Sequence, residues 1–229
     1  MNQQLGCARL TKAKEISIII ITCKEQQVTV NSLSYCPVPY QLILSRKYGT
    51  GHARNYGAKQ AKHDLLVFLD DDLILKPEIW DYVLTTNHGE FRMTFLSDFP
   101  CTRVMSIHKH DFWKVGGFDE KIQVTGEDRE FYARAVEHGL KFTKIPINLT
   151  IHKHHTPRSK NKRTVIRGAY EDMRFVLKYG MKHPSQVFKS DFIERAKKGR
   201  FRTLMLELMF LPYCVLTQIF KGKLQEDGK

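Results

Sequence analysis

Short apolar runs separated by polar loops mark out the first 150 residues of the chain. Three of these runs are rich in β-branched and aliphatic side chains: residues 16–22 (ISIIIIT), 40–45 (YQLILS) and 64–70 (DLLVFLD). Runs that are apolar on both faces are typical of strands buried in a parallel sheet. Three later runs are also strand-like: residues 91–96, 102–109 and 141–152.

Helical patterns alternate with these strands. The first covers residues 51–62, and a second begins at Pro77, a residue type that suits the first turn of a helix. Asp111 is a suitable N-cap for a short helix that ends at a glycine pair, and a longer helix covers residues 126–139. Short connections between strands and helices predict an α/β fold with a mixed, mainly parallel sheet flanked by helices. From about residue 160 the pattern becomes helical, which predicts a helical C-terminal appendage.

Composition places the chain among ordinary globular proteins. It has 229 residues, 42% of them hydrophobic and 27% charged, which is enough to bury a core. The five cysteines are scattered without a CxxC pair, which indicates a reducing compartment and argues against a zinc site or a disulfide framework. The first fifteen residues are polar, so we expect no secretory signal and a cytoplasmic location.

The net charge of +13 is concentrated in the last third of the chain. Residues 1–152 hold 19 Lys and Arg against 17 Asp and Glu, whereas residues 153–229 hold 18 against 7. Such an excess suits nucleic acid, an anionic membrane surface or phosphorylated substrates, and it also suits a plain solvated surface. A basic nucleic-acid-binding α/β protein without catalysis is therefore the alternative function. No RNA-binding signature is present, and that alternative gives the acidic motifs below no role.

An apolar segment lies inside this basic region at residues 203–220 (TLMLELMFLPYCVLTQIF). Its 18 residues include Glu207 and Pro212, so it is borderline in length and polarity for a membrane-spanning helix. Basic residues flank it on both sides, which favours a helix lying in the interface of an anionic leaflet. A helix packed on the catalytic domain or in a dimer interface is the alternative, and the oligomeric state stays open.

Three adjacent carboxylates follow the third strand in FLDDDLIL, residues 68–75. Ligands of open parallel sheets bind beyond the carboxyl ends of the strands, where these acids fall. Successive side chains alternate faces there, so we expect Asp70 and Asp72 to converge on one site and Asp71 to point elsewhere. Two carboxylates with room for waters and phosphates suit Mg²⁺ or Mn²⁺. A strand-end turn with exposed acids is the simpler reading, and an aspartyl phosphotransferase motif is disfavoured by Leu73 at its hydroxyl position.

A second acidic motif opens the helix at residues 126–139. Glu127 and Asp128 follow Gly126, and acids in a first turn stabilise the helix dipole by roughly 0.3–1 kcal/mol each. Stabilisation of the helix dipole does not explain why the glycine turn VGGFDE, residues 115–120, stands shortly before these acids in the sequence.

These motifs together resemble glycosyltransferase family 2 on a GT-A fold, which is Rossmann-like. The resemblance covers roughly residues 14–155 and rests on four motifs in order: ARNYGA (53–58), the DxD at 70–72, VGGFDE (115–120) and GED (126–128). It implies a catalytic domain at residues 1–157 and a basic helical region at 158–229. It also implies that Asp70 and Asp72 hold Mn²⁺ or Mg²⁺ against the donor diphosphate.

The resemblance further implies the roles of the GED acids. Asp128 would be the general base that deprotonates an acceptor hydroxyl, and Glu127 would orient the acceptor or the sugar. One base and one direct displacement imply inversion at the anomeric centre. Because a late histidine often completes the metal shell in this family, His152 and His154 are candidate ligands. The histidines could equally be exposed side chains of a basic loop.

One departure from the family concerns the nucleotide pocket. Members usually carry an acidic turn after the second strand, but this chain has Ser45, Arg46 and Lys47 there. We therefore expect a nucleotide pocket that is built differently, from Thr22, Lys24 and Arg54. Asn55, Asp70, Asp71 and Arg158 complete the expected donor-binding set, Arg158 in a loop that could close over the diphosphate.

The expected activity is metal-dependent, inverting hexosyl transfer from a nucleotide-sugar donor to a hydroxyl acceptor. The acceptor would be a growing glycan or a lipid-linked molecule, because the basic apolar tail suits a membrane surface. The expected location is the cytoplasm, peripheral to the inner face of the cell membrane.

Overall fold

A computed structural model describes residues 15–25, 27–96, 99–122, 126–153 and Pro212 of the chain. Within these ranges eight strands are present: β1 (Ile16–Ile21), β2 (Tyr40–Ser45), β3 (Leu65–Asp70), β4 (Leu73–Leu75), β5 (Glu90–Leu96), β6 (Phe99–His108), β7 (Lys141–Ile145) and β8 (Thr150–His152). The helices of the same ranges are α1 (Val28–Asn31), α2 (Thr50–Gln60), α3 (Ile79–Leu84), α4 (Lys109–Lys114) and α5 (Glu127–Glu137), with 3₁₀ turns at Ser32–Tyr35 and Ile147–Leu149.

The main sheet has six strands in the order β2-β1-β3-β6-β5-β7. The pairs β1–β2, β1–β3 and β5–β7 are parallel, whereas β6 runs antiparallel to both of its neighbours, β3 and β5. The predicted mixed, mainly parallel α/β sheet is therefore confirmed, and all six predicted strand positions carry strands. Because β1 and β3 run in the same direction, Ile21 and Asp70 lie side by side at one edge of the sheet.

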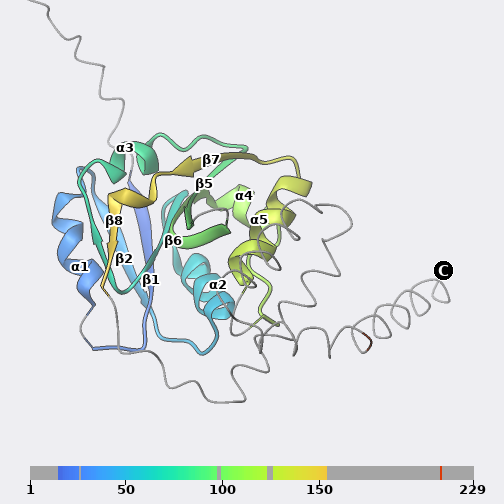
Figure 1. The fold of residues 1–229 in the computed structure, drawn as a ribbon, viewed down its shortest axis with the longest axis horizontal. Coiled ribbons are helices and arrows are strands. Elements are labelled where there is room, and N and C mark those ends of the chain that lie inside the picture. Colours follow the sequence, from blue (N-terminus) through green and yellow to red (C-terminus); the bar gives the residue numbers. More distant parts are fainter. Residues whose placement is uncertain (1–14, 26, 97–98, 123–125, 154–211, 213–229) are drawn as a thin grey trace, which may run out of the picture.

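Two apolar layers cover the two faces of this sheet. Figure 1 shows α2, α4 and α5 on one side, and α1, α3 and the short β4–β8 ribbon on the other. The side chains of β1 divide accordingly: Ile19 joins the cluster with Phe68, Phe112 and Phe131, whereas Ile18 joins the cluster under Trp80. Both faces are buried, which explains why β1 and β3 are apolar at nearly every position.

Helix α2 packs unusually close to the sheet because of one glycine. A Cβ built on Gly57 would lie 2.4 Å from Cγ2 of Ile19, a distance at which something must shift. Glycine lowers intrinsic helix propensity, but here it lets the helix backbone approach β1 directly. This close contact fixes the position of Arg54, one turn earlier on the same helix.

Two predicted elements differ from the structure. The strand expected over residues 141–152 is interrupted after Ile145, because Pro146 leads into a 3₁₀ turn before the chain resumes as β8. The short helix expected to follow Asp111 begins earlier, at Lys109, with Asp111 inside it. The Asp111 carboxylate does not cap its own helix, because its Oδ2 accepts a hydrogen bond from the backbone N–H of Gly89 at 2.7 Å.

The C-terminal expectations lie outside the described residues. They concern the domain boundary at 157, the helical region 158–229 and the membrane-interface segment 203–220, of which only Pro212 is described. Within the described part of the chain, no helix is both long enough and apolar enough to cross a membrane.

Candidate active site

The acidic triplet lies at the end of β3 but does not continue the strand. Strand β3 ends at Asp70, and Asp71 and Asp72 form a turn that leads into β4. Thr29 holds this turn, since its hydroxyl donates to the carbonyl oxygen of Asp70 at 2.6 Å and accepts from the N–H of Leu73 at 2.9 Å. The expectation that strand alternation orients the three acids was therefore wrong. A turn fixed by a threonine from α1 orients them instead.

Asp71 faces the end of β1. Its Oδ2 accepts a hydrogen bond from the Thr22 hydroxyl at 2.7 Å, and its Oδ1 lies 3.2 Å from the Lys24 ammonium. The backbone N–H of Lys24 donates to the same Thr22 oxygen at 3.0 Å. The structure thus brings together three residues of the expected donor-binding set, with Asp71 ordering the short loop that follows β1.

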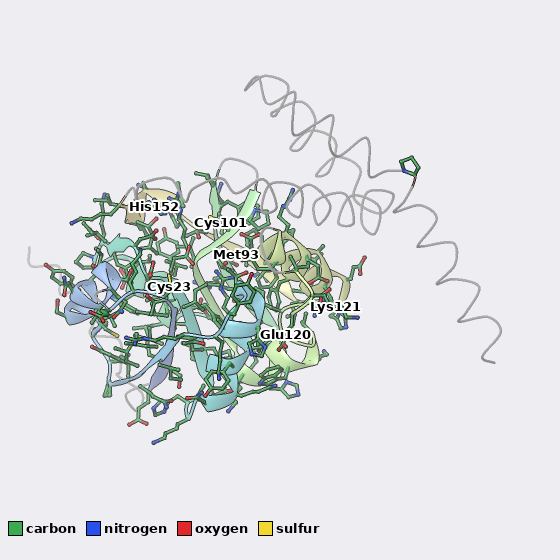
Figure 2. All side chains as sticks on the ribbon, turned by 90° about the horizontal axis from the view of Figure 1, so that it is seen from below. Cys23, Met93, Cys101, Glu120, Lys121 and His152 are labelled. Carbon is green, nitrogen blue, oxygen red and sulfur yellow. The ribbon has the colours of Figure 1, made fainter. Side chains whose placement is uncertain are left out.

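Asp72 meets a histidine from the far end of the described chain. The β4–β8 ribbon pairs Leu73 with His152, and this places His152 Nε2 at 3.1 Å from Asp72 Oδ2. The backbone N–H of Lys153 also donates to the carbonyl oxygen of Asp72 at 2.9 Å. Figure 2 labels His152 at the end of this ribbon. A carboxylate and an imidazole at this spacing are suitable first ligands for a divalent metal.

Arg54 connects the acidic turn to helix α5. Its Nη2 lies 3.1 Å from Asp70 Oδ1 and its Nη1 lies 2.8 Å from Glu127 Oε1, while the guanidinium stands 5.2 Å from the centre of the Phe118 ring. The side chain is only 4% exposed. Burial opposes the charged form, but the Glu127 and Asp70 carboxylates outweigh it and raise the pKa of Arg54. Arg54 was expected to contact the nucleotide, but its terminal nitrogens already bind two carboxylates of the site.

The charge balance of the acidic turn remains uneven despite this arginine. Burial raises the pKa of Asp70 to about 6; Arg54 acts in the opposite direction, and the nearby Asp72 carboxylate adds to the rise. Two carboxylates that repel each other in a partly buried turn favour a cation between them and solvent. Asp72 and His152, whose Oδ2 and Nε2 lie 3.1 Å apart, therefore suit a divalent ion, with Asp70 as a further carboxylate beside them.

Helix α5 brings the second pair of acids to the site. It begins after Gly126, whose φ of 89° is a left-handed conformation that glycine adopts readily. Glu127 is buried against Arg54, whereas Asp128 is partly exposed. Burial raises the pKa of Asp128 to about 7, and the adjacent Glu127 carboxylate adds to the rise. A carboxyl group with this pKa can take up a proton at neutral pH.

The glycine turn positions α5 through Asn55. The Asn55 amide nitrogen donates to Phe118 O and Glu120 Oε1, each at 2.9 Å, and its oxygen accepts from Phe118 N at 2.8 Å. Gly117 has a φ of 67°, and a Cβ there would lie 2.7 Å from Asn55 Oδ1. Asn55 was expected to contact the donor. The residue is only 4% exposed and its amide group is fully occupied by this turn, so Asn55 holds the glycine turn in place.

Two predicted site residues cannot be placed. His154 and Arg158 lie outside the described residues. Conversely, sequence reasoning missed Thr29, because a threonine that bridges a distant turn leaves no local pattern. The ARNYGA motif singles out Arg54, but it does not reveal that Arg54 bridges two carboxylates, because these partners are 16 and 73 residues away.

Two family models match consecutive parts of the chain. "Glycosyl transferase family 2" matches residues 40–98, and "N-terminal domain of galactosyltransferase" matches residues 90–158. The chain is a glycosyltransferase similar to family 2. The first match contains Arg54 and the acidic turn, and the second contains the glycine turn, the GED acids and His152. No curated protein gives a significant sequence match to this glycosyltransferase.

Solved structures share the fold of this glycosyltransferase. The mannosyltransferase PcManGT from Pyrobaculum calidifontis, solved with GDP-Man and Mn²⁺, has a TM-score of 0.59 at 10% identity, covering 91% of this chain and 79% of that one. Glucosyl-3-phosphoglycerate synthase from Mycobacterium tuberculosis, solved with Mg²⁺ and UDP, has a TM-score of 0.53 at 12% identity, covering 73% and 80%.

A third structure comes from an animal enzyme. The catalytic domain of Drosophila beta1,4-galactosyltransferase 7, solved with xylobiose, has a TM-score of 0.52 at 16% identity, covering 64% of this chain and 75% of that one. At these identities the likeness shows the fold, and the glycosyltransferase described here therefore has the GT-A architecture.

Proposed function

We propose that this glycosyltransferase moves a sugar, of the hexose type, from a nucleotide-diphosphate donor to a hydroxyl acceptor with inversion, using Asp128 as the general base. The observation that carries the proposal is the Asp128 carboxyl group, whose pKa of about 7 suits proton uptake at neutral pH. Through Glu127 and Arg54, Asp128 is tied to the acidic turn on the opposite side of the site. The base and the leaving-group site are thus held in one network.

In the proposed reaction each of these groups has one role. Asp128 takes the proton of the acceptor hydroxyl while that oxygen attacks the anomeric carbon of the donor. The bond from this carbon to the diphosphate oxygen breaks, and its electron pair leaves with the nucleoside diphosphate. Because one oxygen replaces another from the opposite side, the configuration inverts. A Mn²⁺ or Mg²⁺ ion held by Asp70, Asp72 and His152 would neutralise the charge that develops on the departing diphosphate.

The donor lies, in this proposal, between the loop after β1 and the acidic turn. Thr22, Lys24 and Asp71 form a hydrogen-bonded cluster there, and Lys24 supplies a positive charge that is 37% exposed. Support also comes from the similar folds, of which two were solved with a nucleotide or nucleotide sugar and a divalent metal. An acceptor that is a glycan or a lipid-linked molecule remains part of the proposal. So does peripheral attachment at the cytoplasmic membrane face through the basic C-terminal region.

A turnover assay tests the proposal directly. The protein is incubated with a panel of nucleotide sugars and Mn²⁺, and release of the nucleoside diphosphate is followed with and without candidate acceptors. Asp128→Asn should lower turnover by about 10²–10⁴-fold, the usual contribution of a general base, while donor affinity measured by calorimetry persists. Asp81→Asn, the same change at an exposed position of α3, is the control and should leave turnover unchanged.

Two results would contradict this assignment. If Asp128→Asn abolished donor binding, Asp128 would be a donor ligand and not the base. If no donor were turned over, and the protein instead bound RNA with strong salt dependence, the nucleic-acid alternative would replace the proposal.

A further inference from the structure

A second cluster of potential metal ligands lies at the other end of β3 from the acidic turn. Asp64 immediately precedes β3, His108 ends β6, and His88 lies in the connection between α3 and β5. One ligand atom from each lies within 4.8 Å of the other two, and the described residues contain no other group of three such side chains. Six residue steps along β3 separate Asp64 from Asp70, which corresponds to about 20 Å. The two sites are therefore distinct.

The buried member of this cluster is already oriented as a ligand. His108 is 4% exposed, and its Nε2 lies 3.1 Å from the carbonyl oxygen of Thr86. Because a carbonyl only accepts, this contact puts a proton on Nε2, and the 2.6 Å contact of Nδ1 with Asp64 Oδ2 is a hydrogen bond whose proton a metal ion would replace. A histidine whose outer nitrogen binds a backbone carbonyl is the usual arrangement at metal centres.

The second histidine has a carboxylate on each side. His88 Nε2 lies 3.4 Å from the same Asp64 Oδ2, and its Nδ1 faces Asp111 Oδ2 at 3.9 Å. Asp111 is buried and fixed by the Gly89 N–H, so it can support the outer nitrogen of His88. The two imidazoles stack with their centres 3.7 Å apart.

The spacing suits a tetrahedral ion once the exposed Asp64 and His88 side chains shift, because the imidazoles stacked with centres 3.7 Å apart must open for both to bind one ion. Ligands about 2.0–2.1 Å from a tetrahedral metal lie about 3.3 Å from one another, close to the 3.4 Å between Asp64 Oδ2 and His88 Nε2. The shorter contact of Asp64 to His108 can lengthen because the Asp64 side chain is 54% exposed and free to rotate. Three protein ligands leave the fourth position to water.

We propose that Asp64, His88 and His108 bind a divalent cation of the zinc class, meaning Zn²⁺, Co²⁺ or Ni²⁺. Two imidazoles and one carboxylate select these metals over Mg²⁺ and Mn²⁺, which prefer oxygen ligands. The ion joins the start of β3, the end of β6 and the loop before β5, so it cross-links the sheet far from the transferase chemistry. The cysteine pattern argued against a zinc site, but this cluster uses no cysteine, and its members are far apart in sequence.

Zinc titration by calorimetry of the full chain tests the proposal. Excess Mg²⁺ is present to occupy the oxygen-rich site. Asp64→Asn and His88→Ala are the test variants, because both side chains are more than half exposed and their removal spares the core. His110→Ala is the matched control: it is an exposed histidine on the same surface, 3.5 Å from Asp111, and is not a member of the triad.

The expected result is one Zn²⁺-binding event that wild type and His110→Ala share and that both test variants lose. At zinc concentrations about 100 times Kd, wild type and control should gain about 5–10 °C in unfolding midpoint over the test variants. Titration with Co²⁺ should give the visible absorption of a tetrahedral site only where the triad is intact. The proposal is overturned if the test variants bind as many zinc ions as wild type. It is equally overturned if His110→Ala loses the same event, since that would indicate non-specific binding to surface histidines.

Discussion

Arg54 and Glu127 form a buried ion pair, with 2.8 Å between Nη1 and Oε1, although 73 residues separate them in the sequence. The same guanidinium reaches Asp70 at 3.1 Å. One side chain from α2 therefore joins the acidic turn after β3 to the first turn of α5. In the proposed reaction it holds the leaving-group side and the base side of the site at a fixed separation.

Replacing Arg54 with lysine should keep the charge but lose the two-pronged contact, because an ammonium cannot bind two carboxylates in the same fork. We expect destabilisation of about 2–4 kcal/mol, since a buried carboxylate loses its partner. We also expect turnover to fall by more than the decrease in the folded fraction of the protein explains. Chemical denaturation and initial rates measure the two effects. Arg92→Lys is the control: it makes the same change in the Arg92–Glu90 pair of β5 and should lower stability without a specific loss of turnover. Equal specific activities for both variants would contradict the bridging role.

The pH dependence of the reaction rate should follow the ionisation of the Asp128 carboxyl group. Its carboxyl group must be ionised to accept a proton, and its pKa is about 7. We therefore expect kcat/KM to rise about tenfold per pH unit below 7 and to level off above it. Initial rates between pH 5 and 9 with Mn²⁺ present give the profile. A rate that stays level down to pH 5 would show that no group with this pKa limits the reaction.

The same group should lower the stability of the folded protein. The pKa of Asp128 is raised from 3.8 to about 7 on folding, so between these values the folded state keeps a proton that the unfolded state has released. Stability therefore falls as the pH rises through this window and is lowest above pH 7. Without divalent ions, Asp128→Asn should be more stable than wild type by about 1–3 kcal/mol at pH 8, with the difference vanishing near pH 4. Denaturation curves that coincide at pH 8 would contradict the raised pKa.

A comparison of alanine substitutions at Gly117 and Gly139 separates the cost of backbone strain from the cost of a steric contact. Both have positive φ, 67° and 79°, but only at Gly117 would a Cβ meet a neighbour, Asn55 Oδ1 at 2.7 Å. Gly139→Ala should cost about 1 kcal/mol from backbone strain alone. Gly117→Ala should cost about 2–4 kcal/mol and lower turnover, because it also displaces the Asn55 amide that holds the turn before α5. Thermal unfolding and rate assays on both variants check this, and equal costs would show that the Asn55 contact is dispensable.

Thr29 and Ser32 offer a similar comparison for the acidic turn. The Thr29 hydroxyl accepts from Leu73 N, and the Ser32 hydroxyl accepts from Leu75 N at 3.2 Å, but only Thr29 also binds the Asp70 carbonyl. Thr29→Val and Ser32→Ala should each destabilise the protein by about 1–3 kcal/mol, because a buried N–H loses its acceptor. Only Thr29→Val should weaken Mn²⁺ binding in calorimetry. Similar Mn²⁺ affinities for the two variants would show that the turn holds its shape without Thr29.

The sequence predicts those parts of the fold that depend on local pattern. The runs around Ile18 and Val67 are buried strands because both faces of the sheet are covered there, and that requirement is visible in the residues themselves. The run around Leu42 forms the edge strand β2, where Leu42 is exposed. The position of the GED acids at a helix start could also be predicted from the local sequence, because a glycine followed by acids is typical of the first turn of a helix. The strand break after Ile145 could have been anticipated from Pro146, which cannot donate to a ladder.

Long-range contacts account for what the sequence did not reveal. The roles of Arg54, Asn55 and Thr29 depend on partners more than 15 residues away, and each of these side chains would suit many other environments. The Asp64–His88–His108 cluster was missed for the same reason. No spacing rule connects the start of one strand, the end of another and the loop before a third.

The pairing of β4 with β8 makes the proposed metal centre a late product of chain synthesis. Asp72 lies near the middle of residues 15–153 and His152 at their end, with residues 73–151 between them, and their contact depends on a ribbon of only three residue pairs. A growing polypeptide exposes its acidic turn long before the histidine emerges from the ribosome. Metal affinity of the complete set is thus a property that the nascent chain acquires in a single step, when β8 docks on β4.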